Sequence, residues 1–485
     1  SSSNFVNDVM LYNNLGAGSV YNKPESNATQ WSLMSYLARI NYTLKHKYLF
    51  SVNARVDGSS RFGTNNKYGF FPSASAGWRI SEEAFMEPVK EVISNLKLRA
   101  SYGFTGNTEI GVYESLATLG TSNWILGNQL VSGFFPNKIP NPDLKWERTG
   151  QFDIGLDLGL FNNRLRITTD YYKKKTTDLL YSVAVPATSG YQTMLKNIGS
   201  IENQGYELSI ESDNLTGAFS WTTAFNIAFN RNKVLELGGE EYKEMAEGDG
   251  HLKTGSVRRL IVGEPIGVFY GYRFDGIFQN EEECKQQTSS ASPIGVGLRR
   301  YKDLNGDGKV DAANDREILG DANPKFFGGL TNTFAYKGFE LNVFLQYSYG
   351  NKILNYNAME LENPTGGQNA YADMVNRWTP ENPSNIYPKA TTNRALLVSD
   401  RFIEDGSYLK LKTLSLSYSF PKINLKHIQG LRLYVTGQNL LTWTKYRGYD
   451  PEVSYRGAST LEAGEDFGGY PQSRTFMFGI KLDIK

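Results

Sequence analysis

Hydrophobic and polar residues alternate strictly along residues 151–172, in two runs separated by a short polar turn. In the first run, apolar side chains occupy every even position from Phe152 to Leu160, with Asp and Gly between them and Gln151 before them. Successive side chains of a β-strand point to opposite faces, so this period of two predicts strands with one apolar and one polar face. The turn 161–164 contains two Asn residues, which tolerate positive φ, and it therefore predicts a hairpin.

The same alternation recurs along the chain and predicts about fifteen strands. These span 31–42, 48–56, 70–80, 96–104, 151–160, 165–172, 205–211, 219–230, 256–262, 266–275, 326–336, 339–349, 408–420, 431–439 and 475–484. Many of them have about ten alternating residues, the length with which a tilted strand crosses a bilayer. One short helix is expected at 81–95, with Ser81 as its N-cap.

The connections between these strands are mostly alternately short and long, and every long loop falls on the same side of the predicted sheet. A soluble β-sandwich has no reason to keep this asymmetry, whereas outer-membrane barrels combine short periplasmic turns with long extracellular loops. The predicted fold is therefore all-β, an antiparallel transmembrane β-barrel whose closed sheet satisfies its backbone groups in lipid. Aromatic residues near predicted strand ends are expected in interfacial girdles: Tyr48, Trp78, Phe104, Tyr171, Phe219, Trp221 and Phe420.

Composition narrows the partners that the chain is expected to have. A net charge of +1 over 485 residues does not support a nucleic-acid partner or a polybasic membrane contact. No run approaches 18 uncharged apolar residues, so no transmembrane helix is predicted. The chain begins with Ser and shows no signal peptide, and we interpret it as processed or partial. The single cysteine, Cys284, excludes an internal disulfide and a Cys-based metal site.

Five long segments, in order along the chain, carry a family resemblance. They are SVNARVDGSSRFGTNNKYGFFPSASAGWRI, NPDLKWERTGQFDIGLDLGLFNNRLRITTDYYKKKTTDLL, DLNGDGKVDAANDREILGDANPKFFGGL, FIEDGSYLKLKTLSLSYSFPK and YVTGQNLLTWTKYRGYDPEV. These segments resemble SusC/RagA-type TonB-dependent outer-membrane transporters.

The resemblance implies a barrel of about 22 strands with an N-terminal plug. It also implies import of oligosaccharides or, in some members, peptides, with a SusD-like surface lipoprotein as partner and the TonB complex as energy source. Residues 1–485 then form the C-terminal part of the barrel, since the plug, the TonB box and the first strands are missing. Two open sheet edges in lipid are prohibitive, so an N-terminal portion of the same transporter is an expected partner, together with outer-membrane lipid. The chain departs from such barrels by ending on Ile484-Lys485 rather than on an aromatic residue.

A candidate cation site lies in an extracellular loop expected at 276–325. The run DLNGDGKVD at 303–311 matches the first half of a calcium loop, in which Gly308 allows the sharp turn. A full loop has Glu at the twelfth position, where this chain has Asn314. The expected ligands are Asp303, Asn305, Asp307, Lys309 through its carbonyl, Asp311 and Asp315. The expected ion is a structural Ca²⁺, with Mg²⁺ as a second option, and the alternative is a polar turn without an ion.

Polar residues of the alternating strands are expected to line the lumen, where contacts with the wall or plug are favoured over contacts with substrate. They are Asn53, Arg55, Asp57, Asp153, Asp157, Arg166, Asp170 and Glu207. Trp124, Trp378 and Tyr387 fall in long loops. The sequence allows two roles for these three aromatic residues, stacking on sugar rings or packing against a SusD-type lid.

The predicted function is active import across the outer membrane of a Gram-negative bacterium, without enzymatic activity, because no nucleophile, zinc or phosphate-binding motif occurs. Three alternatives remain. A passive or adhesive barrel is favoured if no plug or TonB box precedes the chain, and a TonB-dependent receptor for another nutrient is a second. A glycan-cleaving enzyme is the third, and it requires two carboxylates about 5–9 Å apart.

Overall fold

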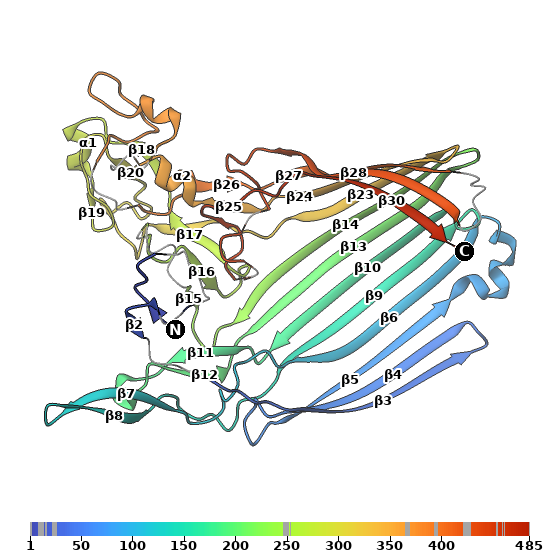
Figure 1. Ribbon diagram of the computed structural model, residues 1–485, viewed down its shortest axis with the longest axis horizontal. Helices are drawn as coiled ribbons and strands as arrows, with labels where there is room; N and C mark the ends of the chain where they lie inside the picture. Colours follow the sequence, from blue (N-terminus) through green and yellow to red (C-terminus); the bar gives the residue numbers. More distant parts are fainter. Residues whose placement is uncertain are drawn as a thin grey trace.

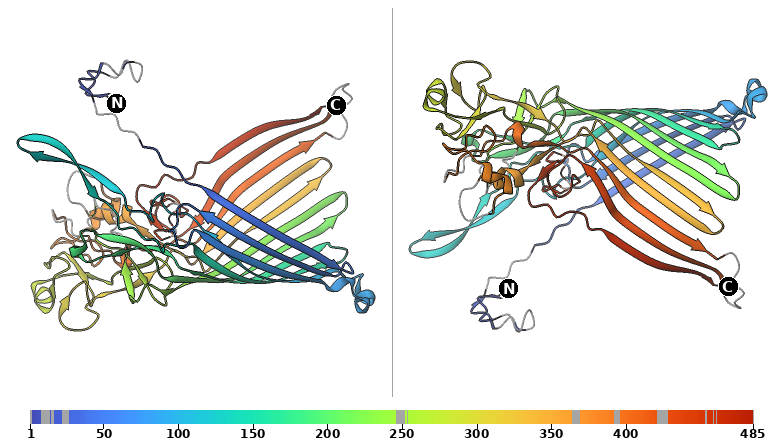
Figure 2. Two further views of the ribbon diagram at one scale, coloured as in Figure 1. Left: turned by 90° about the horizontal axis from the view of Figure 1, so that it is seen from below. Right: turned by 90° about the horizontal axis from the view of Figure 1, so that it is seen from above.

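Thirteen long strands form one antiparallel sheet that curves around a central space in the computed structural model (Figures 1 and 2). The structure describes residues 2–7, 14, 17–21, 27–245, 252, 254–363, 369–391, 396–420, 428–452, 454–457, 459 and 461–484. In sheet order the strands are β3 (Leu33–Leu44), β4 (Tyr48–Ser59), β5 (Tyr68–Arg79), β6 (Ile93–Asn107), β9 (Glu147–Leu160), β10 (Leu165–Thr177), β13 (Ser200–Thr216), β14 (Phe219–Glu236), β23 (Phe326–Tyr336), β24 (Phe339–Tyr349), β27 (Tyr408–Ser419), β28 (Ile428–Thr444) and β30 (Thr475–Ile484). The order follows the sequence, and β3 and β30 are the two edges.

The hairpin predicted at 151–172 is present as β9 and β10. Leu160 pairs with Leu165, and the ladder continues to Arg148 opposite Thr177. Its turn holds Phe161, Asn162 and Asn163 at φ of 54°, 56° and 61°, the left-handed conformation for which Asn is well suited. The turn residues therefore set the register in which the apolar row from Phe152 to Leu160 faces the same way as the row from Leu165 to Tyr171.

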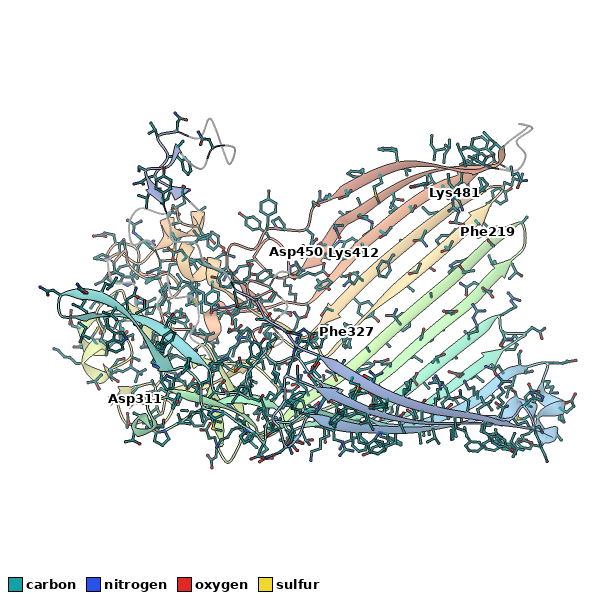
Figure 3. The ribbon with its side chains drawn as sticks, turned by 60° about the horizontal axis from the view of Figure 1, so that its bottom comes forward. Phe219, Asp311, Phe327, Lys412, Asp450 and Lys481 are labelled. Atoms are coloured by element: carbon teal, nitrogen blue, oxygen red, sulfur yellow. The ribbon has the colours of Figure 1, made fainter. Side chains whose placement is uncertain are left out.

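The apolar rows of the strands remain exposed along the outside of the sheet. Phe219, labelled in Figure 3, has 43% of its surface exposed and pairs on this face with Tyr336, which has 47% of its surface exposed. Such large exposed apolar surfaces are uncommon on a soluble protein and suit contact with hydrocarbon. One aromatic residue expected in a girdle has a different place, because Phe104 packs against the buried cluster of Phe62, Phe71, Leu144 and Trp146.

The long connections all lie at one end of the sheet and the short ones at the other (Figure 1). This asymmetry agrees with the prediction, but two of the fifteen predicted strands are not part of the sheet. Residues 256–262 and 266–275 contain β16 (Arg258–Ile261), β17 (Val268–Tyr272) and the start of β18 (Phe274–Ile277), which lie in the insertion between β14 and β23. The prediction was wrong there because these strands are largely buried rather than exposed on one face. Apolar runs of this length do not reveal which sheet they join.

The insertions at the long-loop end, and the residues before β3, carry small sheets and short helices of their own. Strands β16 and β17 join β15 (Tyr242–Glu244) and β22 (Arg316–Gly320), and β18 pairs with β20 (Arg299–Tyr301). The others are β1 (Ser2–Ser3), β2 (Val20–Tyr21), β7 (Leu119–Leu126), β8 (Gln129–Pro136), β11 (Leu180–Ala184), β12 (Thr193–Asn197), β19 (Thr288–Ser289), β21 (Lys309–Val310), β25 (Lys352–Asn355), β26 (Ile403–Asp405) and β29 (Glu465–Asp466), with helices α1 (Glu281–Gln286) and α2 (Tyr356–Leu361) and 3₁₀ turns η5 (Ala187–Ser189), η6 (Ala372–Asn376) and η7 (Asp400–Phe402). Within the described part of the chain, no helix has the length and apolarity needed to cross a membrane.

At the short-turn end, the helix expected at 81–95 is replaced by two 3₁₀ turns, η3 (Ile80–Glu82) and η4 (Ala84–Val89). Ser81 lies inside the first turn and is not its N-cap. Pro88 interrupts the second turn, and residues 93–95 already belong to β6. The expectation was wrong because proline removes a backbone donor and the strand pairing of β6 begins early.

At the same end of the barrel, Glu83 connects the turn after β5 with the start of β4 and the end of β5. Its carboxylate accepts hydrogen bonds from Tyr48 Oη at 2.7 Å and Trp78 Nε1 at 3.0 Å, and it pairs with Lys47 Nζ at 3.0 Å. The hydrogen bonds from Tyr48, Lys47 and Trp78 lower the pKa of Glu83 from 4.5 to about 2. A carboxyl whose pKa is lower in the folded state stabilises the fold above its unfolded pKa. This contribution is lost as the pH falls from about 4.5 to about 2.

Replacement of Glu83 by Gln is therefore expected to flatten the acid dependence of stability. Between about pH 4.5 and pH 2 the wild type should lose more stability than the variant, because only the wild type has this carboxylate to protonate. Thermal unfolding of the full-length protein across that range measures the difference. Glu82→Gln, which leaves Glu83 and its three donors in place, is the control. Parallel pH profiles for wild type and Glu83→Gln would contradict the expectation.

Candidate functional site

Two hollows lie along the polar face of the sheet. The first has a volume of about 540 Å³ and is lined by Arg39, Asn53, Arg55 and Asp57 on β3 and β4, with Trp146 at the long-loop end. The second has a volume of about 270 Å³ and lies nearer the short-turn end, between β4, β5, β6 and β9. The polar face is thus the hollowed one, as expected for the lumen of a barrel.

An arginine that lines the second hollow, Arg99, pairs with two carboxylates. Arg99 Nη2 lies 3.0 Å from Asp157 Oδ1 and 2.9 Å from Asp170 Oδ1. Arg99, Gly155 and Asp170 occupy one register row across β6, β9 and β10. A Cβ on Gly155 would lie 2.1 Å from Asp170 Oδ1 and 2.7 Å from Arg99 Nη2, so the absent side chain leaves the space in which the ion pair forms. Gly155 of the alternating strand thus has a structural role.

The other residues expected in the lumen also lie on the polar face. Arg55 pairs with Asp57 at 2.7 Å, and Arg166 pairs with Glu211 at 3.1 Å. Within the described residues, neither Asp153 nor Glu207 has an ion pair. The wall therefore combines internally neutralised pairs with carboxylates that remain available to other groups in the lumen.

The insertions 237–325, 350–407 and 445–474 pack together into one body, which we call the long-loop cap. Its core contains fully buried side chains from the first two insertions, among them Phe269, Leu354 and Phe402, with Phe467 of the third packed against them. The remaining buried members are Leu252, Val257, Tyr356, Ala358, Met359, Leu396 and Val398. The loops above the lumen are therefore a folded unit with an apolar core rather than separate extended segments.

A buried lysine joins this cap to the barrel wall. Lys410 on β27 has 1% of its surface exposed, and its Nζ lies 3.1 Å from Asp450 Oδ1 and also contacts Glu452. Lys412 Nζ lies 3.1 Å from the same Glu452. Burial alone would raise the pKa of Glu452, but hydrogen bonds and charge from Lys410 and Lys412 outweigh it and lower that pKa. Figure 3 shows Lys412 and Asp450 close to the rim where the third insertion returns to the sheet.

The segment 303–315, which resembles a calcium loop, lies in the cap, and Figure 3 labels its Asp311. Asp303 accepts backbone hydrogen bonds from Gly306 and Gly308, both at 2.7 Å. The fully buried Asp315 accepts from Leu304 N at 2.8 Å and from Asp311 N at 2.7 Å. The other expected ligands are engaged as well: Asn305 donates to Asp307 at 3.0 Å, Asp307 accepts from Lys309 N at 2.8 Å, and Lys309 Nζ lies 3.2 Å from Asp311.

These oxygens have the chemistry that Ca²⁺ prefers, but their hydrogen bonds stabilise a turn. Among the described residues, no three His, Cys, Asp or Glu side chains gather in a way that could hold a metal ion. The six predicted ligands are thus brought into one compact turn, with their carboxylates directed to backbone N–H groups.

The hairpin of β7 and β8 projects from the long-loop end into solvent (Figure 2). Residues 115–137 contain no charged side chain. Apolar side chains are exposed on both faces of the hairpin: Leu119, Trp124, Ile125, Leu126, Leu130, Val131, Phe134 and Phe135. Ile125 has 77% of its surface exposed and pairs across the ladder with Leu130 at 71%. A two-stranded ribbon of this kind is marginal in water on its own, so the hairpin has the character of a contact surface.

The other two loop aromatics have internal roles. Trp378 donates from Nε1 to Gln279 Oε1 at 3.0 Å, and Tyr387 donates from its hydroxyl to Asp373 at 3.2 Å. Of the three aromatic residues considered in the sequence, Trp124 alone is largely exposed.

Comparison with known proteins decides the family. A family model described as TonB dependent receptor-like, beta-barrel, matches residues 2–440. The chain belongs to this family.

Its relatives include TonB-dependent receptor P3 of Formosa agariphila, 41% identical over 485 residues, which cover 99% of this chain and 48% of the relative. TonB-dependent receptor SusC of Bacteroides thetaiotaomicron is 32% identical over 476 residues, covering 94% of this chain and 44% of SusC. The solved structure of the RagAB peptide transporter matches with a TM-score of 0.80 and 28% identity, over 96% of this chain and 50% of the matched one. The chain thus spans about half the length of the relatives it matches.

Membership of the TonB-dependent receptor family confirms three predictions. The fold is an outer-membrane β-barrel fold, the location is the outer membrane of a Gram-negative bacterium, and the resemblance to SusC and RagA is real. Proteins of this family are receptors and transporters rather than enzymes, which also agrees with the prediction.

Residues of the wall and cap that sequence reasoning missed are mainly cations. Arg99, Lys410 and Arg258 each bind carboxylates from distant segments, such as Arg258 Nε with Glu465 Oε1 at 2.7 Å. The sequence carried one usable signal, because Arg99 occupies a polar position of an alternating strand. Arg258 is followed by Arg259, and Lys410 alternates with leucines as Lys412 does, so nothing in the local sequence marks Arg258 or Lys410 as the buried one.

Proposed function

We propose that this chain is the C-terminal part of the barrel of a SusC-like active importer. The proposed complete protein has an N-terminal plug, takes up oligosaccharides or peptides with a SusD-like surface lipoprotein, and is driven by the TonB complex. The observation that carries the proposal is the shape match of 0.80 to a peptide transporter, together with a polar, hollowed inner wall. An inner wall of paired charges around the lumen suits polar cargo rather than lipid.

The open edges of the sheet support the N-terminal portion as a partner. Strands β3 and β30 end the sheet on either side, and an edge in lipid leaves a row of backbone groups without hydrogen bonds. A chain that spans about half the length of its relatives leaves room for the strands that would pair with both edges.

Uptake measurements test the proposed function. The full-length protein in its host is expected to import labelled oligosaccharide or peptide only when TonB is intact. Deletion of TonB should abolish uptake and leave the amount of barrel in the outer membrane unchanged. Uptake that continues without TonB would favour the passive barrel instead, and surface attachment without any uptake would favour the adhesive one.

The hairpin of β7 and β8 is the proposed docking site for the lipoprotein. Its uncharged, apolar surface needs a partner that removes it from water, and burial of three such side chains is worth several kcal/mol. Replacing Trp124, Ile125 and Leu130 with Thr is expected to weaken the complex by about 100-fold or more, since Thr keeps strand propensity but removes apolar area.

Affinity purification of the full-length protein measures the retained lipoprotein. Asn123→Thr with Ser132→Thr, a polar pair on the same two strands, is the matched control. Equal recovery of the lipoprotein from the triple variant and the control would rule out this surface.

The segment 303–315 is the proposed site of a structural Ca²⁺, with Mg²⁺ as the second option. Its oxygen donors and tight Gly-containing turn support the proposal. Removing divalent cations with a chelator is expected to speed proteolysis within the segment and to leave the barrel folded, because the turn lies in the cap. Limited proteolysis of the full-length protein with and without Ca²⁺ measures the change.

Asp307→Ala should remove the protective effect of Ca²⁺, and Asp321→Asn, outside the motif in the same insertion, should keep it. Crystals soaked in Ca²⁺ that show no ion among these oxygens would refute the site.

A further inference from the structure

The long-loop cap contains a buried guanidinium without a carboxylate partner. Arg299 on β20 has 9% of its surface exposed and donates from Nη2 to the backbone oxygen of Glu362 at 3.1 Å. No described residue accepts a hydrogen bond from its Nε. An arginine side chain has five N–H donors and stays charged in proteins, so burying one whose Nε has no acceptor is costly.

The neighbouring charges do not neutralise it. The carboxylate of Glu362 is already bound by Arg401 Nη2 at 2.6 Å and Arg447 Nη1 at 2.8 Å, and Glu404 is bound by Arg447 Nη2 at 2.7 Å. The cluster therefore has three guanidiniums, counting Arg299, for two carboxylates. Residues 364–368 and 392–395, which are outside the described part, contain no Asp or Glu. One positive charge remains.

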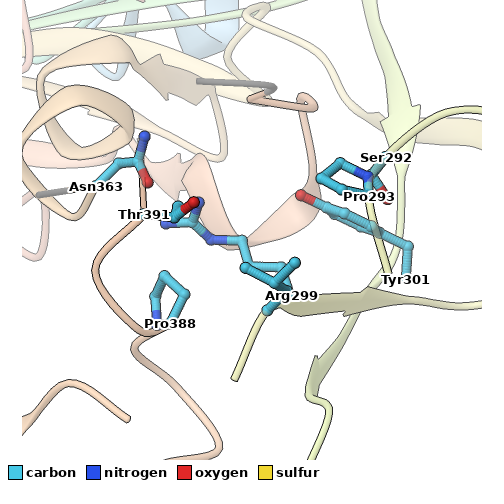
Figure 4. Close-up of a pocket in the computed structure, with 8 residues that line it drawn as sticks. Ser292, Pro293, Arg299, Tyr301, Asn363, Pro388 and Thr391 are labelled. Carbon is cyan, nitrogen blue, oxygen red and sulfur yellow. The ribbon is translucent and has the colours of Figure 1, made fainter. Parts of the chain in front are cut away.

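A small pocket opens beside this charge (Figure 4). It has a volume of about 30 Å³, and its lining includes Arg299, Tyr301, Ser292 and Asn363 together with Pro388 and Pro293. A single water needs about 10–15 Å³ on this measure, so the space suits a group of two or three heavy atoms. In Figure 4 the hydroxyl end of Tyr301 points toward the side of the pocket on which the Arg299 guanidinium lies.

We propose that this pocket binds a single small anion no larger than a carboxylate group, held by Arg299 and Tyr301. The guanidinium donates from Nε and the phenol donates from its hydroxyl, and both are charge-assisted bonds to an anion. Burial lowers the pKa of the Arg299 guanidinium and raises the pKa of Tyr301, so an anion favours the charged arginine and a phenol that keeps its proton. This proposal goes beyond import and does not rest on it.

Two sources have this chemistry, a free anion and the carboxylate end of a larger molecule. Bromide is the probe for the first, because it fits the pocket and is visible by anomalous scattering. Crystals of the full-length protein soaked in sodium bromide are expected to show an anomalous peak beside Arg299 Nε. This measurement needs no variant, so it does not depend on whether a substitution folds.

Formate is the probe for the carboxylate group. At constant ionic strength, formate should raise the thermal unfolding temperature of the wild type, and Arg299→Gln should weaken formate binding by roughly 10- to 100-fold. Arg300→Gln is the matched control, because Arg300 is half-exposed and already paired with Asp275 at 2.9 Å.

Pockets without bromide, together with equal formate responses in wild type and Arg299→Gln, would overturn the proposal. A carboxylate side chain from the rest of the polypeptide seated against Arg299 in the full-length structure would overturn it as well, since the anion would then be part of the fold. Import that fails in a protein still binding bromide would refute the proposed function alone.

Discussion

Lys410→Met is expected to destabilise the junction between the cap and the barrel by about 3–5 kcal/mol. Lys410 is fully buried, and its ammonium group contacts both Asp450 and Glu452, the second of which also pairs with Lys412. Methionine matches the shape of the side chain but leaves the buried Asp450 without its cation and Glu452 with Lys412 alone. Such a loss is large because removal of one member of a buried ion cluster leaves the others uncompensated.

Denaturant unfolding of the full-length protein measures this effect, with proteolytic cleavage within 445–474 as the signal of an opened junction. The control is Lys412→Met, because Lys412 contacts the same Glu452 with 30% of its side chain exposed. Exposed pairs contribute about 0–1 kcal/mol, so this control should change little. Equal losses for the two lysines would show that burial of Lys410 does not govern the strength of the junction.

Phe269→Ala is expected to cost about 3–5 kcal/mol within the long-loop cap while the barrel stays folded. The ring is fully buried in the core of the cap, and the guanidinium carbon of Arg258 lies 4.2 Å above its centroid. Truncation leaves a cavity and removes the surface against which the buried arginine packs. The thirteen strands have their own backbone ladders, so their stability does not depend on this core.

Two measurements on the full-length protein separate cap from barrel. Protease sensitivity of 237–325 reports on the cap, and the heat-dependent mobility shift on gels reports on the barrel. Phe269→Leu, which nearly conserves volume, is the control and should cost less than about 1.5 kcal/mol. Loss of the gel shift in Phe269→Ala would show that cap and barrel unfold as one unit.

The sequence predicted the barrel wall well because a strand with lipid on one side and water on the other must alternate. Both strands of the hairpin β9–β10 were placed within five residues of their observed ends, and the paired Asn residues marked their turn. The prediction for the strand at 431–439 was too short, since β28 continues to Thr444. Asn439 there adopts φ of 52°, and this irregularity interrupts the period of two before Leu440.

The sequence predicted individual residues of the candidate site but not which of them contact one another. The inner-wall carboxylates Asp157 and Asp170 were identified from their alternating positions, but their partner Arg99 was found only through strand register. The sequence of the cap showed no comparable alternation of polar and apolar positions that would predict its fold. Strands β16 and β17 are largely buried, so their pattern did not distinguish them from strands of the wall.

By itself, the sequence determined that this chain is a stretch of outer-membrane barrel with all its long loops at one end, because side-chain alternation and turn chemistry act over a few neighbouring residues. Only the tertiary structure decided that three insertions pack into one cap. It also decided that Lys410 meets two carboxylates and that Arg299 is left with one positive charge in excess. Buried charges are matched by residues tens to hundreds of positions apart, and no local pattern specifies such pairs.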